Sequence, residues 1–209
     1  MPDIEVYNKY REQLSILIDK NVTENHKNIL IFGDKFPSLE EKWISEGKKI
    51  THLKDIKSDW AEKMTNFNFE KNDFDLLISF HGLEKSLDPE KLLLELRKPL
   101  SKSADFICIT YNSSHISSIT NLFTEGWKKK EDGAIREGNI KYFSYDSLKH
   151  TLKMSGFEVV GEDIYGFAEQ TEMTKKLSSF TKNPYLSALS FILRAKRMEG
   201  FPFIEGTYP

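Results

Sequence analysis

The sequence has little of several features that define common classes of protein. Cysteine occurs once in 209 residues, as Cys108, which excludes an internal disulfide and is typical of a reducing compartment. No apolar run approaches the length of about 18 residues that a membrane-spanning helix needs, and the N-terminus lacks the apolar segment of a signal peptide. We therefore predict a cytoplasmic protein with no membrane span.

An excess of charge of one sign is also absent. Thirty Lys and Arg residues stand against 32 Asp and Glu residues, so the net charge is −2. A nearly neutral chain creates no field that would draw it to a nucleic acid or to an anionic membrane. We predict neither as a partner.

The length favours a single α/β domain, because 209 residues suffice for one full core. Residues 1–27 are expected to form an N-terminal helix, residues 28–197 the core, and residues 198–209 a C-terminal tail. The tail, "MEGFPFIEGTYP", is too apolar for an ordinary disordered end. We expect it to pack on a sheet edge or across a dimer interface, so a homodimer is possible.

Short apolar runs alternate with amphipathic stretches along the core. The run "ILIF" is typical of a parallel strand that is covered on both faces, and "KKITHL", "DFDLLISF" and "DFICIT" are predicted as further strands. Between them, Pro37 suits the first turn of a helix whose buried stripe is Leu39, Trp43 and Ile44, and Asp88 with Pro89 begins a second helix. Alternating strands and helices predict a doubly wound, mostly parallel sheet.

Several longer motifs follow one another in a recognisable order. They are "ILIFG", "FDLLISFHGLEKSLDPEKLLLELRKPL", "ITYNSSH" and "GWKKKEDGAIREGNIKYFSYDSLKHTLKMSGFEVV". This order resembles class I S-adenosylmethionine-dependent methyltransferases, in particular the small bacterial type associated with glycosyltransferases and surface-glycan synthesis. The resemblance covers nearly the whole chain. It implies a Rossmann-like α/β fold with a seven-stranded, mostly parallel sheet that ends in an antiparallel hairpin, residues 157–164 and 188–197.

The resemblance assigns S-adenosylmethionine to the turn after the first strand, where Gly33, Asp34 and Lys35 stand. The family has glycines at the later positions, because glycine allows a close backbone approach. This sequence has Lys35 and Pro37 instead. Lys35 places a positive charge beside a sulfonium and Pro37 removes an N–H, so we predict weak or absent cofactor binding.

Two further cofactor anchors are altered. The acid that should bind the ribose aligns with Lys54, and only a slip of one residue brings Asp55 into place. The acid that should hold the adenine is replaced by Asn66 or Asn68. His81 and Glu84 follow another strand, and we expect both to face the same cleft.

The residues that would handle the acceptor are altered as well. Where the related enzymes carry an Asp and a His, this chain has Arg136 and Asn139, and neither can act as a general base near neutral pH. The remaining candidate base is His115, since an imidazole titrates in the right range. His81 and Glu84 have no third ligand at a usual spacing, so no metal site is predicted. The other histidines, His26, His52 and His150, are expected on the surface.

Three functions remain open. The first, which the altered anchors favour, is a methyltransferase-fold protein that has lost cofactor binding and acts as a binding or scaffolding partner, for example of a glycosyltransferase or another glycan-pathway enzyme. The second is an active methyltransferase for a sugar or another small hydroxylated molecule. The third is a protein that binds a different nucleotide ligand, with Lys35 on a phosphate.

Overall fold

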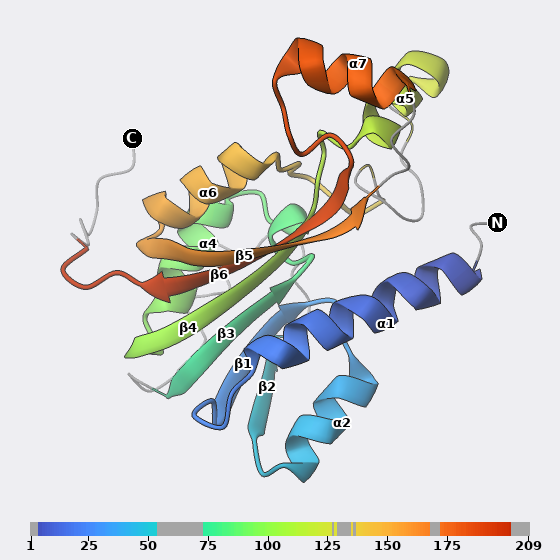
Figure 1. The fold of residues 1–209 in the computed structure, drawn as a ribbon. Coiled ribbons are helices and arrows are strands. Elements are labelled where there is room, and N and C mark those ends of the chain that lie inside the picture. Colours follow the sequence, from blue (N-terminus) through green and yellow to red (C-terminus); the bar gives the residue numbers. More distant parts are fainter. Residues whose placement is uncertain are drawn as a thin grey trace.

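The protein folds around one sheet (Figure 1). The computed structural model describes residues 4–53, 73–126, 128, 135, 137–167 and 172–201. Within them the sheet has six strands in the order β2-β1-β3-β4-β6-β5. Their bounds are β1 Asn28–Gly33, β2 Lys49–Leu53, β3 Phe74–Phe80, β4 Leu100–Tyr111, β5 Phe157–Phe167 and β6 Ala188–Arg197.

The strand directions confirm the predicted fold class. β1 runs parallel to β2 and β3, and β3 runs parallel to β4, whereas β6 is antiparallel to both β4 and β5. The predicted count of seven strands differs from the six in the described part of the chain. Residues 54–72, which include the anchor positions Asp55, Asn66 and Asn68, lie outside that part.

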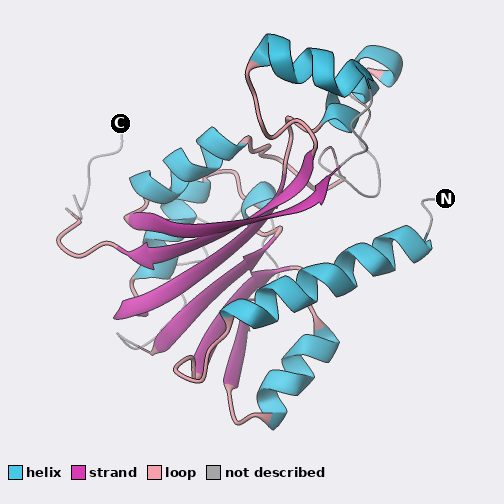
Figure 2. Ribbon diagram, viewed as in Figure 1, coloured by secondary structure: helices cyan, strands magenta, loops and turns pink. Residues whose placement is uncertain are grey.

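Helices cover both faces of the sheet (Figure 2). Helices α4 and α6 pack on one face around Leu93, Phe106 and Leu152, and α1 and α2 pack on the other around Leu14, Trp43 and Ile107. The helices are α1 Ile4–Asn21, α2 Pro37–Ser45, α4 Pro89–Arg97, α5 Ile116–Glu125, α6 Tyr145–Met154 and α7 Glu172–Thr181, with a short 3₁₀ turn, η2, at Leu83–Lys85. Cys108 is a buried core residue, as expected.

The predicted helix signals are largely confirmed, with one error. Asp88 caps α4 by accepting a hydrogen bond from the Lys91 amide at 2.9 Å, and Ser144 caps α6. Ile44, predicted on the buried stripe of α2, is 58% exposed. Each helical residue is turned by about 100° from the last, so a helix that buries Leu39 and Trp43 turns Ile44 toward solvent.

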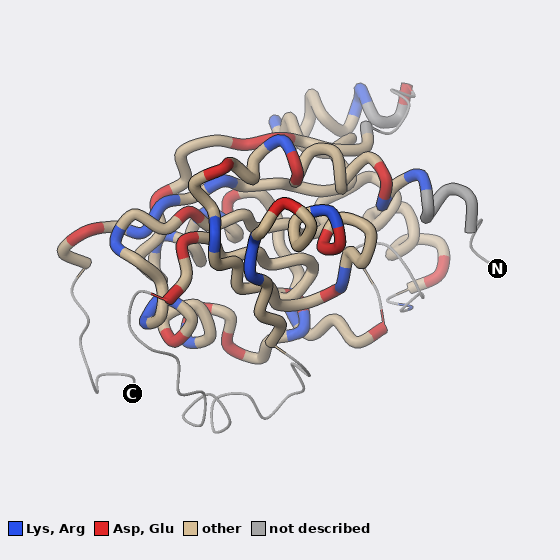
Figure 3. The backbone as a smooth tube through the Cα atoms, turned by 90° about the horizontal axis from the view of Figure 1, so that it is seen from below, with Lys and Arg blue, Asp and Glu red and all other residues tan. Residues whose placement is uncertain are grey.

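Charged residues of both signs are interspersed along the chain, as Figure 3 shows for the part that the structure describes. No helix within that part has the length and hydropathy needed to cross a membrane. The apolar tail beyond residue 201 lies outside the described residues, so its predicted packing stays a prediction.

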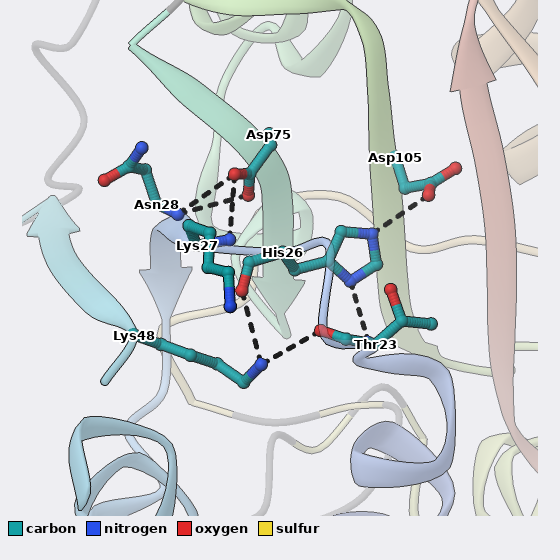
Figure 4. Close-up of polar contacts among 7 residues, drawn as sticks. All are labelled: Thr23, His26, Lys27, Asn28, Lys48, Asp75 and Asp105. Carbon is teal, nitrogen blue, oxygen red and sulfur yellow. Dashed lines mark hydrogen bonds and ion pairs between the residues drawn. The ribbon is translucent and has the colours of Figure 1, made fainter. Parts of the chain in front are cut away.

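His26 is not the surface residue that the sequence predicted (Figure 4). It is only 6% exposed, and its Nε2 lies 3.0 Å from Asp105 Oδ2. The Thr23 amide donates to Nδ1 at 3.0 Å, so Nε2 carries the proton that is donated to Asp105. The polar surroundings of His26 in the sequence gave no sign of a partner 79 residues away. His52 is also not a surface residue: it is half-buried, and its Nε2 lies 2.7 Å from Glu40 Oε2. His150 is exposed, as expected.

Other polar groups join His26 where the chain enters the sheet. Lys48 donates to the carbonyls of Thr23 and His26, at 2.9 and 3.3 Å. Asp75 of β3 accepts hydrogen bonds from the Lys27 and Asn28 amides (Figure 4). These contacts fix where β1 begins, and therefore where it ends at the opposite edge of the sheet.

Replacing His26 with Ala should lower the free energy of unfolding by about 1–3 kcal/mol, because the Thr23 amide and Asp105 lose a partner in a largely buried site. Urea denaturation measures the change. The control is His150→Ala, which alters an exposed histidine and should stay within about 0.5 kcal/mol of the parent. Equal midpoints for the two variants would show that the His26 contacts contribute nothing.

Candidate functional site

The carboxyl ends of β1, β3 and β4 meet at one edge of the sheet. Gly33 lies opposite Phe80 in the register of β1 and β3, and Phe80 lies opposite Ile109 of β4. Ligands of open parallel sheets bind at this edge. The side chains here therefore decide what the protein can bind.

The turn after β1 packs directly against the end of β3. Gly33 has φ +101°, and a Cβ at this position would lie 2.0 Å from the Phe80 carbonyl oxygen. The next amide, of Asp34, donates to the same oxygen at 2.7 Å. Glycine is therefore required here by the packing of two strands, whether or not a ligand is present.

The same turn is tied to two other elements. Asp34 forms an ion pair with Lys85 of η2, and the Lys35 carbonyl accepts a hydrogen bond from Arg11 of α1. Phe36 is 8% exposed and packs edge-on against Phe80, with the ring centroids 4.0 Å apart. The Arg11 guanidinium lies over both rings, 4.8 Å from the Phe36 centroid and 5.9 Å from the Phe80 centroid, a cation–π geometry.

His81, directly after β3, is the centre of a buried polar chain. Its backbone has φ +48°, a left-handed conformation that is uncommon outside glycine. Its Nδ1 lies 3.0 Å from Glu84 Oε1, and its Nε2 lies 3.1 Å from the Tyr10 hydroxyl, which is 2.7 Å from Ser190 Oγ. Because the carboxylate only accepts, we assign the Nδ1 proton to the bond with Glu84, so a neutral His81 accepts from Tyr10.

Aromatic rings stack against this chain of hydrogen bonds. The His81 ring stacks on Tyr111 at 3.9 Å and 11°, and Tyr111 stacks on Tyr10 at 5.6 Å. Burial raises the pKa of the Tyr10 phenol well above its ordinary value, with the neighbouring Tyr111 adding to the shift. Tyr10 therefore stays a neutral donor at all physiological pH values.

Glu84 connects this chain of hydrogen bonds to the loop that carries Asn139. Its Oε1 also accepts from the Tyr111 amide at 3.0 Å, and its backbone carbonyl accepts from the amides of Ile140 and Lys141. Asn139 precedes these amides and is 1% exposed. Glu84 Oε2 is buried without a hydrogen-bond partner among the described residues. Of the predicted site residues, Gly33, Asp34, His81, Glu84 and Asn139 thus gather at this end of the sheet.

His115 lies where β4 leads into α5, and it caps that helix. Its Nδ1 accepts hydrogen bonds from the Ser117 amide at 3.2 Å and from Ser117 Oγ at 2.7 Å. The neutral ring then carries its proton on Nε2, which is buried without a well-aligned partner in the described chain. Burial lowers the pKa of His115, and the backbone of Ser187 partly opposes the shift.

Two of the predicted site residues, Asp55 and Arg136, lie outside the described residues. Lys35 is exposed. No group of three or more potential metal ligands occurs in the part of the chain that the structure describes. Sequence reasoning missed Tyr10, Arg11, Phe36, Lys85 and Tyr111. Tyr10 falls in the predicted N-terminal helix, and nothing in the sequence pairs its hydroxyl with His81.

Comparisons with known proteins identify the family. Residues 12–162 match the profile of a family described as a methyltransferase domain, and this span is well over half of the chain. The chain belongs to this methyltransferase family. No curated protein matches it.

Solved structures confirm the fold. A SAM-dependent methyltransferase from Archaeoglobus fulgidus superposes with a TM-score of 0.62 at 16% identity, covering 94% of this chain and 100% of that one. A 1,6-didemethyltoxoflavin-N1-methyltransferase from Burkholderia thailandensis, solved with its substrate and S-adenosylhomocysteine, gives 0.56 at 11% identity, with coverage of 94% and 82%. A SAM-dependent methyltransferase from Methanosarcina mazei gives 0.56 at 13% identity, with coverage of 87% and 97%.

The lowered pKa of His115 predicts a pH dependence of stability. The unfolded chain binds a proton near the ordinary value of about 6.5, and the folded chain binds it only at lower pH, so stability falls as pH drops below about 6.5. His115→Asn keeps a capping side chain and removes the titration. The loss of stability between pH 7.5 and 5.5 should therefore be smaller in this variant.

Denaturation midpoints across this pH range measure the effect. Ser117→Ala is the control, because it removes one partner of the imidazole and leaves the titrating ring in place. Identical pH profiles for the parent and His115→Asn would contradict this prediction. They would show that the pKa of His115 is the same in the folded and the unfolded protein.

Proposed function

We propose that this methyltransferase-family protein binds S-adenosylmethionine weakly and acts as a binding or scaffolding partner in surface-glycan synthesis. The supporting observation is that the side chains at the turn after β1 are packed against one another. Phe36 and Phe80 are in contact, Arg11 lies over both rings, and Asp34 is paired with Lys85. The residues present fit a closed packing arrangement better than an open cradle for a cofactor.

Electrostatics support the same proposal. Arg11, Lys35 and Lys85 place three cationic residues on or beside the turn. The two acids there already have partners, Asp34 with Lys85 and Glu40 with His52 and the Phe36 amide. A sulfonium carries a positive charge, and two like charges at close range repel each other even when partly screened. A cationic methyl donor is therefore a poor match for this turn.

The proposal also requires a surface that can bind a partner protein. Phe123 of α5 is 82% exposed and Phe180 of α7 is 86% exposed. Figure 1 places α5 and α7 at the same end of the molecule. Exposed aromatic side chains are enriched in protein interfaces. The link to glycan synthesis rests on the sequence resemblance alone.

An active methyltransferase is the alternative, and the fold similarity to methyltransferases favours it. One of those structures holds S-adenosylhomocysteine, which makes S-adenosylmethionine the cofactor to test here. His115 would be its candidate base, but the ring would first have to release its hydrogen bond with the Ser117 amide. A different nucleotide ligand bound through the exposed Lys35 is the third possibility. Turnover of a methyl acceptor distinguishes the second function from the other two.

Titration calorimetry with S-adenosylmethionine and S-adenosylhomocysteine tests the proposal. We expect dissociation constants no lower than roughly 100 μM for the parent, because a lost ribose anchor removes about 1.5–3 kcal/mol and the turn adds further penalties. Phe36→Ala should strengthen binding about tenfold by removing the ring from the turn. A low-micromolar constant for the parent, or cofactor carried through purification, would contradict the proposal.

The matched control is Leu39→Ala. Leu39 is 6% exposed and belongs to the same apolar cluster, but it lies in α2 beyond the turn. This truncation destabilises the same region without opening the turn, so it should leave the affinity unchanged. An equal gain in both variants would mean that general loosening, and not the Phe36 ring, limits binding.

A further inference from the structure

A cavity at the opposite end of the sheet brings together several basic residues. Its volume is about 240 Å³, and it is lined by Arg97, Lys102, Arg197, Met198, Glu199 and Gly200. Arg97 ends α4, Lys102 lies near the start of β4, and Arg197 ends β6. This end lies on the order of 35 Å from the carboxyl end of β4, given the length of its 12 residues. It is therefore separate from the cofactor end.

Arg97 is held rigidly at the wall of this cavity. It is only 7% exposed, and its Nη2 donates to the Met198 carbonyl at 2.5 Å. The Phe201 ring centroid lies 5.4 Å from its guanidinium carbon. Gly156 packs against both groups, since a Cβ there would lie 2.9 Å from Arg97 Nε and 2.9 Å from the Phe201 ring. A guanidinium that is fixed in this way loses little further entropy when it binds a ligand.

Glu199 is the one acid among the described lining residues, against the three basic residues Arg97, Lys102 and Arg197. Arg197 donates to the Leu100 carbonyl, and neither Arg97 nor Arg197 forms an ion pair there. Arg97 Nε is buried without a hydrogen-bond partner in the same part of the chain. Burial lowers the pKa of Arg97, and the charge of Arg197 adds to the shift. Two partly desolvated cations that repel each other are stabilised when an anion binds between them.

We propose that this cavity binds a small phosphorylated ligand through its phosphate group. Guanidinium groups present paired N–H donors that match phosphate oxygens, and Lys102 adds a third, exposed charge. The volume is suited to a phosphate or diphosphate and is below the roughly 300–1,000 Å³ that larger ligands occupy.

A second cavity beside the first provides room for the rest of such a ligand. Its volume is about 350 Å³, and Met198 lines both cavities. Its other lining residues are the apolar Phe157 and Val159, the basic Lys149, His150 and Lys153, and one acid, Glu158. An organic group attached to the phosphate would therefore meet apolar surface next to further positive charge. This proposal does not depend on the function of the cofactor end.

Titration calorimetry with inorganic pyrophosphate, in a buffer free of phosphate and sulfate, tests the site. Sodium chloride holds the ionic strength constant. We expect saturable binding of one pyrophosphate per chain by the parent. Arg197→Gln should weaken that binding at least tenfold, and Lys102→Gln should weaken it about threefold.

Two features of the variants keep the result interpretable. Lys102 is exposed and has no bond to the described chain, so Lys102→Gln tests the site even if Arg197→Gln folds poorly. Lys196→Gln removes the same charge from an exposed position on β6 outside the cavity lining, and its affinity should stay within twofold of the parent. Absent binding to the parent, or equal weakening in Lys196→Gln and Lys102→Gln, would overturn the proposal.

Discussion

The buried chain of hydrogen bonds from Ser190 through Tyr10 and His81 to Glu84 fixes the end of the molecule where a methyltransferase holds its cofactor. It joins α1, β6 and the segment after β3 in one polar network inside an otherwise apolar layer. A buried polar group without a partner costs about 1–3 kcal/mol, so each member of the network depends on the others. Because Tyr10 belongs to α1, the network also holds that helix, and its Arg11, over the turn that follows β1.

The two ends of the sheet therefore differ in character. At the carboxyl end of the parallel strands, charges are paired and rings are stacked, as Asp34 with Lys85 and His81 with Tyr111 show. At the other end, Arg97, Lys102 and Arg197 line a cavity in which Glu199 is the one acid among the described residues, so positive charge is in excess. Glu84 Oε2 is an exception at the first end, since it has no hydrogen-bond partner among the described residues. A site with unbalanced charge gains more from a ligand than one in which most charges are paired.

The sequence predicted those features that depend on local chemistry. Asp88 before Pro89, Pro37 at the start of its helix, and the strand runs all act within a few residues, and each of them formed as expected. His26, Tyr10 and Arg97 could not be predicted in the same way, because their environments are made by residues brought together only in the folded chain. Along the chain, His26 lies 79 residues from Asp105, Tyr10 lies 180 residues from Ser190, and Arg97 lies 101 residues from Met198. The prediction for Ile44 was wrong for a geometric reason. An apolar residue that is next in sequence to the buried stripe of a helix can still face solvent.

The most direct test of a closed cofactor end is amide hydrogen exchange along α1 in the parent and in Tyr10→Phe. The substitution keeps the ring stacked on Tyr111 and removes only the hydroxyl that bridges Ser190 and His81. If the network holds α1 in place, exchange across the helix should speed up at least tenfold while the amides of β3 and β4 keep their protection. Unchanged exchange in α1 would contradict the account, because the helix would then be held by apolar packing alone.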